Sequence, residues 1–218
     1  MNNGSWEKIY NEQGIVQHEI LNTVVEAIEL FKSKKYKYIF DLGCGTGRNT
    51  VYLASKGFQV LASDISKKGL DITKEEVNKH NLSDKVTYDT QDMFDMALPN
   101  NNFDAVLCVW TQGHGLKHQI QKSINEVYRI LKMGGMTVMD FVTVDDNTFG
   151  LGKKIAPNTF VGGRPGEEDI PHYYATMDDL KKMFSKYSNV KYIDRTYEFK
   201  DNNGKEHIIE AIVVHAEK

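Results

Sequence analysis

FDLGCGTGRNTVYLASKGFQVLASD, residues 40–64, is the stretch of this sequence that decides the fold. It begins in an apolar segment, passes a turn with three glycines between Asp41 and Gly47, and continues through a helix-period segment into a second apolar segment. Strand, turn, helix and strand in this order form a βαβ unit, and open α/β sheets bind ligands at the carboxyl ends of their strands. Because glycines permit close approach of the backbone, the stretch predicts a ligand site at the turn.

Apolar strand-type segments and helix-period segments alternate along the rest of the chain, which is typical of a largely parallel sheet covered by helices. The last two strand-type segments flank Asp201-Asn202-Asn203-Gly204, and an Asn-Gly pair at such a place indicates a hairpin. The expected strands are 38–40, 58–62, 86–90, 103–110, 136–142, 190–199 and 207–215. The expected helices are 16–31, 49–56, 67–80, 116–132 and 177–187. Gly134-Gly135 is expected to stop the helix over 116–132. The fold class is therefore α/β: a Rossmann-like doubly wound sheet of about seven strands, mostly parallel with a C-terminal antiparallel hairpin.

The 218 residues are expected to form one domain, 1–218, whose first part, 1–35, is a helical cap. A hydrophobic content of 40% is enough for one substantial core at this length. Between Asp145 and Pro171 glycine and proline are frequent, and no regular element is expected. A loop of this length in a compact domain predicts a lid or substrate-binding insertion, here over 145–175.

Two aspartates stand where the second and third expected strands end. Asp64 ends the second strand, and Asp92 ends the third, with Met93 directly after it. A carboxylate in the first of these positions accepts hydrogen bonds from both hydroxyls of a ribose. Arg48 occupies the place where a dehydrogenase fingerprint needs Gly or Ala, which argues against a dinucleotide site. The chain has no Gly-Lys-Ser/Thr, which excludes a P-loop.

Three segments, FDLGCGTGRNTVYLASKGFQVLASDIS, TQDMFDMALPNNNFDAVLCVW and INEVYRILKMGGMTVMDF, together resemble the class I S-adenosylmethionine-dependent methyltransferases. The resemblance runs from Tyr36 to His215 and implies S-adenosyl-L-methionine as the cofactor. In that family the glycine turn lies under the methionine part, an acid binds the ribose, and apolar residues flank the adenine. Matched residue by residue, the implied contacts are Asp41, Gly43 and Gly45 for the methionine part, Asp64 for the ribose, Ile65, Asp92 and Met93 for the adenine, and Val109 for the region near the reaction centre.

Each of these residues also has a purely structural interpretation. The glycines can simply form a tight turn, and Asp64 or Asp92 can cap the helix or turn that follows it. Their combination in one βαβ frame favours the cofactor interpretation.

The expected substrate side lies in loops above the same sheet edge. Methyl transfer from a sulfonium depends on alignment more than on covalent help, so no catalytic triad is expected. His114, in the loop after the fourth strand, and His172, in the long loop, are the candidate bases, although an exposed loop histidine is an equal alternative for His114. Arg164 is a candidate to hold an anionic substrate, and Tyr173 is a candidate wall of the substrate site.

Two aromatic residues near the N-terminus, Trp6 and Tyr10, share one helix face at i, i+4 spacing. They are candidates to fold over the site and contact the substrate or the sulfonium, with plain packing as the alternative. No metal is expected: His114 and His118 have the same spacing, but the flanking glycines make a poor helix and no paired carboxylate motif accompanies them.

Composition restricts the partners. With 27 basic and 30 acidic side chains the net charge is −3, so nothing in the charge balance favours a membrane or nucleic-acid partner. The two cysteines fit reduced thiols, no signal-like or membrane-spanning segment is evident, and the expected location is the cytoplasm.

The resemblance implies methyl transfer by in-line displacement, and the lid-sized insertion, without added basic or recognition domains, favours a small-molecule acceptor. The alternatives are a protein or RNA methyltransferase, a non-catalytic cofactor-binding module and a nicotinamide-dependent reductase. Val109-Trp110-Thr111-Gln112 replaces the Asn/Asp-Pro-Pro-aromatic motif of base amino-methylases, which makes nucleic acid a less favoured acceptor.

Overall fold

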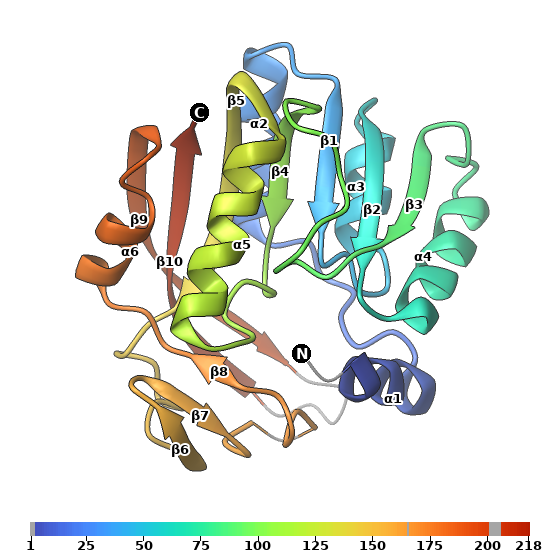
Figure 1. Ribbon diagram of the computed structural model, residues 1–218. Helices are drawn as coiled ribbons and strands as arrows, with labels where there is room; N and C mark the ends of the chain where they lie inside the picture. The colour runs from blue at the N-terminus through green and yellow to red at the C-terminus, as the bar shows by residue number, and fades with distance from the viewer. Residues whose placement is uncertain (1–2, 165, 201–205) are drawn as a thin grey trace.

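A seven-stranded sheet runs through the centre of the computed structural model, which describes residues 3–164, 166–200 and 206–218 (Figure 1). Its strand order is β3-β2-β1-β4-β5-β10-β9, so the direction in which strands are added reverses between β1 and β4. The first five pair in parallel, and β10 pairs antiparallel with both β5 and β9. The bounds are β1 (Tyr38–Leu42), β2 (Gln59–Asp64), β3 (Val86–Thr90), β4 (Phe103–Cys108), β5 (Leu131–Val142), β9 (Ser188–Lys200) and β10 (Glu206–Glu217). The expected mostly parallel sheet with a terminal antiparallel pair is confirmed.

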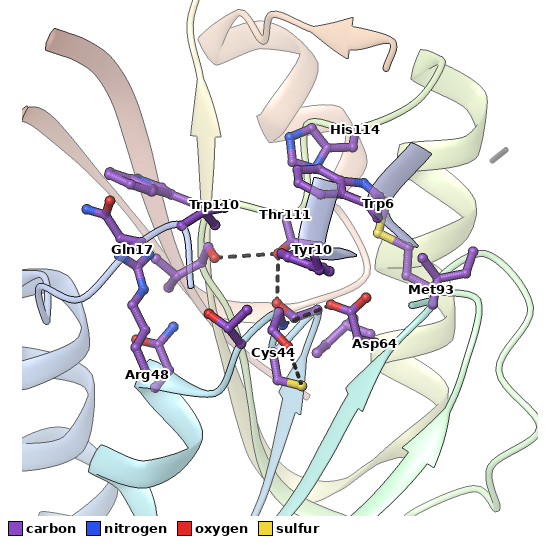
Figure 2. Close-up of a pocket in the computed structure, with 18 of the residues that line it drawn as sticks. Trp6, Tyr10, Gln17, Cys44, Arg48, Asp64, Met93, Trp110, Thr111 and His114 are labelled. Atoms are coloured by element: carbon purple, nitrogen blue, oxygen red, sulfur yellow. Dashed lines mark hydrogen bonds between the residues drawn. The ribbon is translucent and has the colours of Figure 1, made fainter. Parts of the chain in front are cut away.

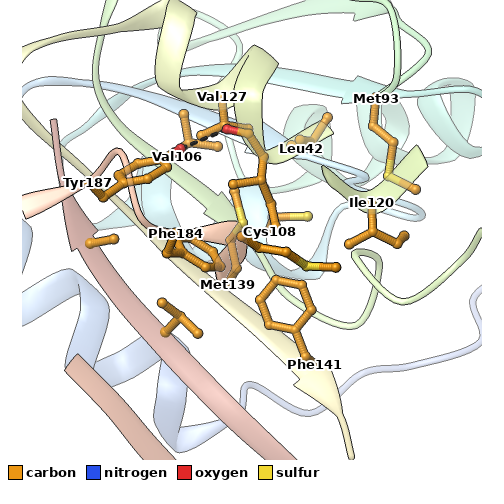
Figure 3. Packing of buried hydrophobic residues seen from close by; sticks show 14 of the residues in the cluster. Leu42, Met93, Val106, Cys108, Ile120, Val127, Met139, Phe141, Phe184 and Tyr187 are labelled. Atoms are coloured by element: carbon orange, nitrogen blue, oxygen red, sulfur yellow. Dashed lines mark hydrogen bonds between the residues drawn. The ribbon is translucent and has the colours of Figure 1, made fainter. Parts of the chain in front are cut away.

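Helices cover both faces of this sheet. Apolar side chains of α2 (Asn22–Ser33), α3 (Arg48–Ser55) and α4 (Lys67–Lys79) pack with one face. On the other face α5 (Lys117–Ile130) and α6 (Met177–Met183) contribute to a second cluster, where Figure 3 shows Ile120 and Val127 beside Cys108 and Met139 of the sheet. Strands buried on both faces explain the nearly continuous apolar runs in the sequence. No helix in the described ranges is long and apolar enough to cross a lipid bilayer.

Three expected helices have wrong boundaries. The helix expected over 177–187 ends at Met183. The segment 16–31 is helical only from Asn22, and a separate helix α1 (Asn3–Gln13) precedes it. The helix expected over 116–132 ends at Ile130, and the strand β5 begins at the next residue, so both glycines that were expected to stop the helix lie inside β5. Ile130 and Leu131 are both fully buried, and this burial carries the chain directly from the helix into the sheet. The proposed hairpin turn, residues 201–204, lies outside the described residues, although β9 and β10 pair as expected.

The expectation of no regular element between residues 145 and 171 is also wrong. This segment contributes to a second, three-stranded antiparallel sheet of β6 (Lys153–Ala156), β7 (Thr159–Val161) and β8 (His172–Tyr173). Its strands are two to four residues long, too short to produce a readable periodicity. Phe149, Phe160 and Tyr174 stabilise it through edge-on ring contacts at 5.4–5.9 Å. This small sheet and α1 lie beyond the carboxyl ends of the parallel strands (Figure 1).

Candidate functional site

The glycine turn after β1 has a backbone that requires glycine. Gly43, Gly45 and Gly47 have φ angles of 73°, 56° and 92°, in the left-handed region that other residues rarely adopt. The N–H groups of Gly43 and Cys44 both donate to the carbonyl of Ser63 at 2.8 Å, which ties the turn to the end of β2. A Cβ on Gly43 would stand 2.3 Å from the side chain of Thr111, so the turn also contacts the loop after β4.

Asp64 links the end of β2 to this turn. Its Oδ2 accepts the Gly45 N–H at 2.9 Å and its Oδ1 accepts the Ser66 N–H at 2.9 Å, while burial raises the pKa of the carboxyl group. The N-cap of α4 is Ser66, whose side chain accepts the Gly69 N–H. Asp64 is therefore not the N-cap of α4, although it makes a local contact with the backbone at the turn before this helix. Each carboxylate oxygen keeps a second lone pair for a ligand.

These groups line a cavity with an empty volume of ≈ 910 Å³ at the switch between β1 and β4 (Figure 2). Most of the predicted cofactor and covering residues line it: Trp6, Tyr10, Gly43, Gly45, Asp64, Ile65, Met93, Val109 and His114. In Figure 2 Asp64 and Met93 lie on one side, with Arg48, Gln17 and Trp110 on the other.

Asp41 and Asp92 lie behind this lining. Asp41 is buried below the turn, where its Oδ2 accepts the Thr50 hydroxyl at 2.6 Å and burial raises its pKa to about 6. The Oδ1 of Asp92 accepts the Phe94 N–H at 2.9 Å, which is the local capping contact considered above. Gln91, next to Asp92, lines the cavity instead. Direct cofactor contacts of Asp41 and Asp92 stay predictions.

Asn49 and Trp110 are among the wall residues that sequence reasoning missed, together with Gln17, Gln91 and Glu167. Asn49 is buried in the first turn of α3, and its Oδ1 has no hydrogen-bond partner among the described residues. Trp110 has a left-handed φ of 60°, which is uncommon for a bulky residue and is characteristic of functional sites. Its N–H donates to Asp140 Oδ1 at 2.7 Å, and the Arg48 guanidinium lies 4.7 Å from its ring centre. No local pattern indicates either contact.

The helix α1 covers the cavity. Glu7 Oε2 accepts the Ser66 hydroxyl at 2.6 Å and the Lys68 N–H at 3.0 Å, which holds α1 at the N-terminus of α4. The rings of Trp6 and Tyr10 stack at 5.7 Å, and Tyr10 is buried. The expectation that these two aromatic residues fold over the site therefore agrees with their positions.

A second cavity, with an empty volume of ≈ 860 Å³, shares part of its wall with the first. The shared residues include Gln17, Trp110, Thr111, His114 and Glu167. The remaining wall comes from β5, β8, β10 and the segment before β8, including Asp140, Arg164, His172 and Tyr173. Asp140 is buried there, and its burial raises its pKa to about 6.

His114 and His172 are neighbours in this shared region. They form an antiparallel bridge, and their rings meet edge to face at 5.1 Å. His114 is 9% exposed, so the exposed-loop interpretation is wrong. Burial is the main cause that lowers its pKa to about 3, and the nearby His172 is the second cause. His172 Nε2 lies 2.6 Å from Glu167 Oε2. Burial acts to raise the pKa of Glu167, but this hydrogen bond and the surrounding charges outweigh it and bring the pKa to about 2.

The two remaining predicted substrate residues have partners of their own. The Tyr173 hydroxyl donates to Asp179 Oδ2 at 2.6 Å, so its ring rather than its hydroxyl is available as a wall. Arg164 Nη2 lies 3.2 Å from Thr148 Oγ1 and 3.7 Å from Asp146 Oδ1. Asp146 partly offsets the charge that a bound anion would contact.

Comparisons with known proteins agree with this geometry. Residues 39–135 match the family model described as a methyltransferase domain. A demethylmenaquinone methyltransferase of Bacteroides fragilis is 29% identical over 125 residues, which are 56% of this chain and 49% of that protein. The chain thus spans about half the length of such a curated relative.

Two solved structures share the fold. A SAM-dependent methyltransferase from Methanosarcina mazei gives a TM-score of 0.69 at 20% identity, covering 84% of this chain and 92% of that one. The magnesium protoporphyrin IX methyltransferase of Synechocystis, solved with bound SAM, gives 0.62 at 16% identity, covering 99% and 90%. At such identities the likeness concerns the fold alone.

Proposed function

The chain carries a class I S-adenosylmethionine-dependent methyltransferase domain, and from this premise we propose that it transfers the methyl group of that cofactor to a small-molecule acceptor. One observation carries the proposal. The cavity bounded by the glycine turn and Asp64 shares the wall of Trp110, Thr111 and His114 with a second cavity of similar size. Two adjoining cavities provide one place for a cofactor and one for an acceptor.

The residues of the first cavity fit S-adenosylmethionine. Gly43 and Gly45 leave room for close approach of the methionine part, while the Asp64 oxygens have lone pairs for ribose hydroxyls. The free Oδ1 of Asn49 is an acceptor suited to the amino group of the methionine part. Ile65 and Met93 supply apolar surface for the adenine. We assign the rest by resemblance: Asp41 supports the turn, Asp92 lies at the adenine edge, and Val109 lies near the reaction centre.

When bound, the cofactor supplies a sulfonium methyl that is already activated for in-line displacement. The task of the protein is then to align the acceptor and exclude water, which contributes roughly 7–11 kcal/mol to lowering the barrier. The stacked Trp6 and Tyr10 exclude water above the cavity. The Tyr173 ring and the Arg164 guanidinium are the proposed walls of the acceptor site.

Two histidines are candidates to take a proton from the acceptor. The low pKa of His114, about 3, makes it a weak base near neutral pH. His172 is better placed, because the Glu167 carboxylate accepts its Nε2–H and orients the ring, as a third group orients the base in other enzymes. We therefore propose His172 as the base of an acceptor that carries a proton.

A small molecule is the acceptor class that this geometry favours. The second cavity is lined by Trp110, His114 and Tyr173 and by parts of the small sheet, so it surrounds its occupant on several sides. A protein segment or RNA strand needs an open groove, and RNA also needs clustered basic side chains. The Bacteroides relative is named for a quinone precursor, which is a planar acceptor. We propose a planar, largely apolar acceptor.

Calorimetric titration with S-adenosylmethionine and S-adenosylhomocysteine tests the cofactor assignment, with NAD as the comparison ligand. Asp64→Asn is expected to weaken binding at least tenfold, about 1.4 kcal/mol. Asp71→Asn, on the exposed surface of α4, is the matched control. Unchanged affinity in Asp64→Asn removes this carboxylate from the ribose site, and failure to bind either adenosyl compound overturns the proposal.

Release of S-adenosylhomocysteine, followed with a panel of quinols, porphyrins, peptides and RNA, tests the acceptor class. Turnover with a planar small molecule is the expected result. Turnover only with peptide or RNA refutes the small-molecule assignment. Cofactor binding without turnover on any of them favours a non-catalytic binding module.

A further inference from the structure

Three side chains with metal-binding atoms converge where the two cavities meet. They are His114, from the loop after β4, His172 in β8, and Glu167 from the segment before β8. One ligand atom from each residue lies within 4.8 Å of the other two. No other three histidine, cysteine or acidic residues gather in this way in the ranges that the structure describes.

The backbone holds the two histidines next to each other. His114 and His172 form a bridge, and the Tyr173 N–H donates to the Gly113 carbonyl at 2.9 Å beside it. His172 also pairs with Phe160 of β7, so it lies between β7 and the loop that follows β4. Facing residues of an antiparallel pair have Cβ atoms roughly 4.5–5.5 Å apart, which brings both imidazoles to the same place. The site is therefore built by main-chain pairing.

Glu167 is held by a turn of its own. Its N–H donates to the Arg164 carbonyl at 3.1 Å, and its carbonyl accepts the Ile170 N–H at 3.0 Å. This turn brings its Oε2 to within 2.6 Å of His172 Nε2, and 30% of its side-chain surface stays exposed. A carboxylate thus joins two buried imidazoles while remaining reachable from solvent.

We propose that His114, Glu167 and His172 bind a divalent transition-metal ion of the Zn²⁺ type. Two imidazoles and one carboxylate are a donor set of catalytic zinc sites and of other open transition-metal sites. Zinc bonds to these atoms are roughly 2.0–2.2 Å long, so ligand atoms around a tetrahedral ion stand about 3.3 Å apart. The ligand atoms lie within 4.8 Å of one another, so side-chain movements that change these distances by at most about 1.5 Å bring the three groups to that spacing.

The charges around the three ligands suit a cation. Glu167 brings a carboxylate to the two imidazoles, and a bound metal ion takes the place of protons on such ligands. Arg164 is the opposing charge nearby, but Asp146 lies 3.7 Å from its guanidinium and offsets it. The net environment of the three ligands therefore admits a cation.

Three protein ligands leave one coordination position open, as in catalytic rather than structural zinc sites. All three residues line the second cavity, so the open position is available to an oxygen of its occupant. Bound there, an acceptor hydroxyl would lose its proton to solvent more easily, and His172 would act as a ligand and not as the base. This use of the ion rests on the proposed methyl transfer, whereas the metal site does not.

Metal titration of the full chain, without cofactor or acceptor, tests the site. Protein stripped with a chelator is titrated with Zn²⁺ by calorimetry and with Co²⁺ by visible absorption. One equivalent is expected to bind, and His172→Ala is expected to weaken binding at least tenfold. Glu167→Gln, which keeps size and shape, gives the same test if His172→Ala fails to fold. His118→Ala, on the exposed surface of α5, is the matched control and should bind as wild type does.

Two results overturn the proposal. The first is the absence of one-equivalent binding in the wild-type chain. The second is evidence that the ion binds elsewhere. Such evidence is either binding that both His172→Ala and Glu167→Gln retain, or a Co²⁺ spectrum with thiolate charge-transfer bands from Cys44 or Cys108. Neither result bears on cofactor binding, which the adenosyl titrations measure separately.

Discussion

Burial of His114 makes the stability of the protein depend on pH in a way that one substitution can isolate. The pKa of its imidazole is about 3 in the folded chain, against a value of 6.5 for an unperturbed histidine. Because the folded-state pKa is lowered, the unfolded chain takes up a proton first as the pH falls. Stability contributed by the uncharged ring is thus present above pH 6.5 and is lost as the pH falls towards 3.

The size of the effect follows from these two values. At pH 7.5 neither state is appreciably protonated at His114, and its contribution to the pH dependence is negligible. At pH 5 the unfolded histidine is almost fully protonated and the folded one is not, which lowers the free energy of unfolding by about 2 kcal/mol. Asp41 and Asp140 act in the opposite sense, because burial raises the pKa of each to about 6 and their stability contribution falls as the pH rises from about 4 to 6.

The assay is therefore a comparison of two proteins. Urea unfolding of wild type and of His114→Gln is measured at pH 7.5 and pH 5.0 with a chelator present, so that no metal contributes. The wild type is expected to lose about 2 kcal/mol more than the variant between these two pH values. His118→Gln is the control for histidine loss on the surface. Equal pH dependence in wild type and His114→Gln would refute the view that His114 is buried uncharged.

The turn and the covering helix yield two further predictions. Gly43→Ala adds a Cβ 2.3 Å from the Thr111 side chain, and we expect cofactor affinity to fall at least tenfold, about 1.4 kcal/mol, together with a lower Tm. Gly57→Ala is the control, because Gly57 also has a left-handed φ but has open space around the new methyl group. This variant should have a lower Tm and an unchanged cofactor affinity, and equal affinity losses in Gly43→Ala and Gly57→Ala would contradict the prediction. Glu7→Ala removes the contacts that hold α1, so stopped-flow measurements should show cofactor dissociation about threefold to tenfold faster; an unchanged rate would mean that α1 does not limit release.

Much of the fold was predictable because it is encoded locally. The β1 turn requires positive φ at Gly43, Gly45 and Gly47, and glycine at all three is visible in the sequence. Strand and helix types follow from apolar periodicity, and β3 begins and ends at the expected residues. The placement of Asp64 in the cavity followed from its position at a strand end, because parallel strands bring their carboxyl ends to one edge. The helix ends were less predictable, since burial of Ile130 and Leu131 outweighed the glycine signal after them.

The sequence by itself determined a βαβ sheet with a glycine turn and a strand-end carboxylate, because these depend on residues close together along the chain. Only the tertiary structure decided which distant residues meet. His114 is far along the chain from Glu167 and His172, and the three residues converge because β8 pairs with the loop after β4, a contact that no periodicity records. Trp110 likewise adopts its left-handed backbone next to Asp140 of β5. Such contacts depend on how a short sheet without a readable pattern packs on the main one, and that packing is a property of the whole chain.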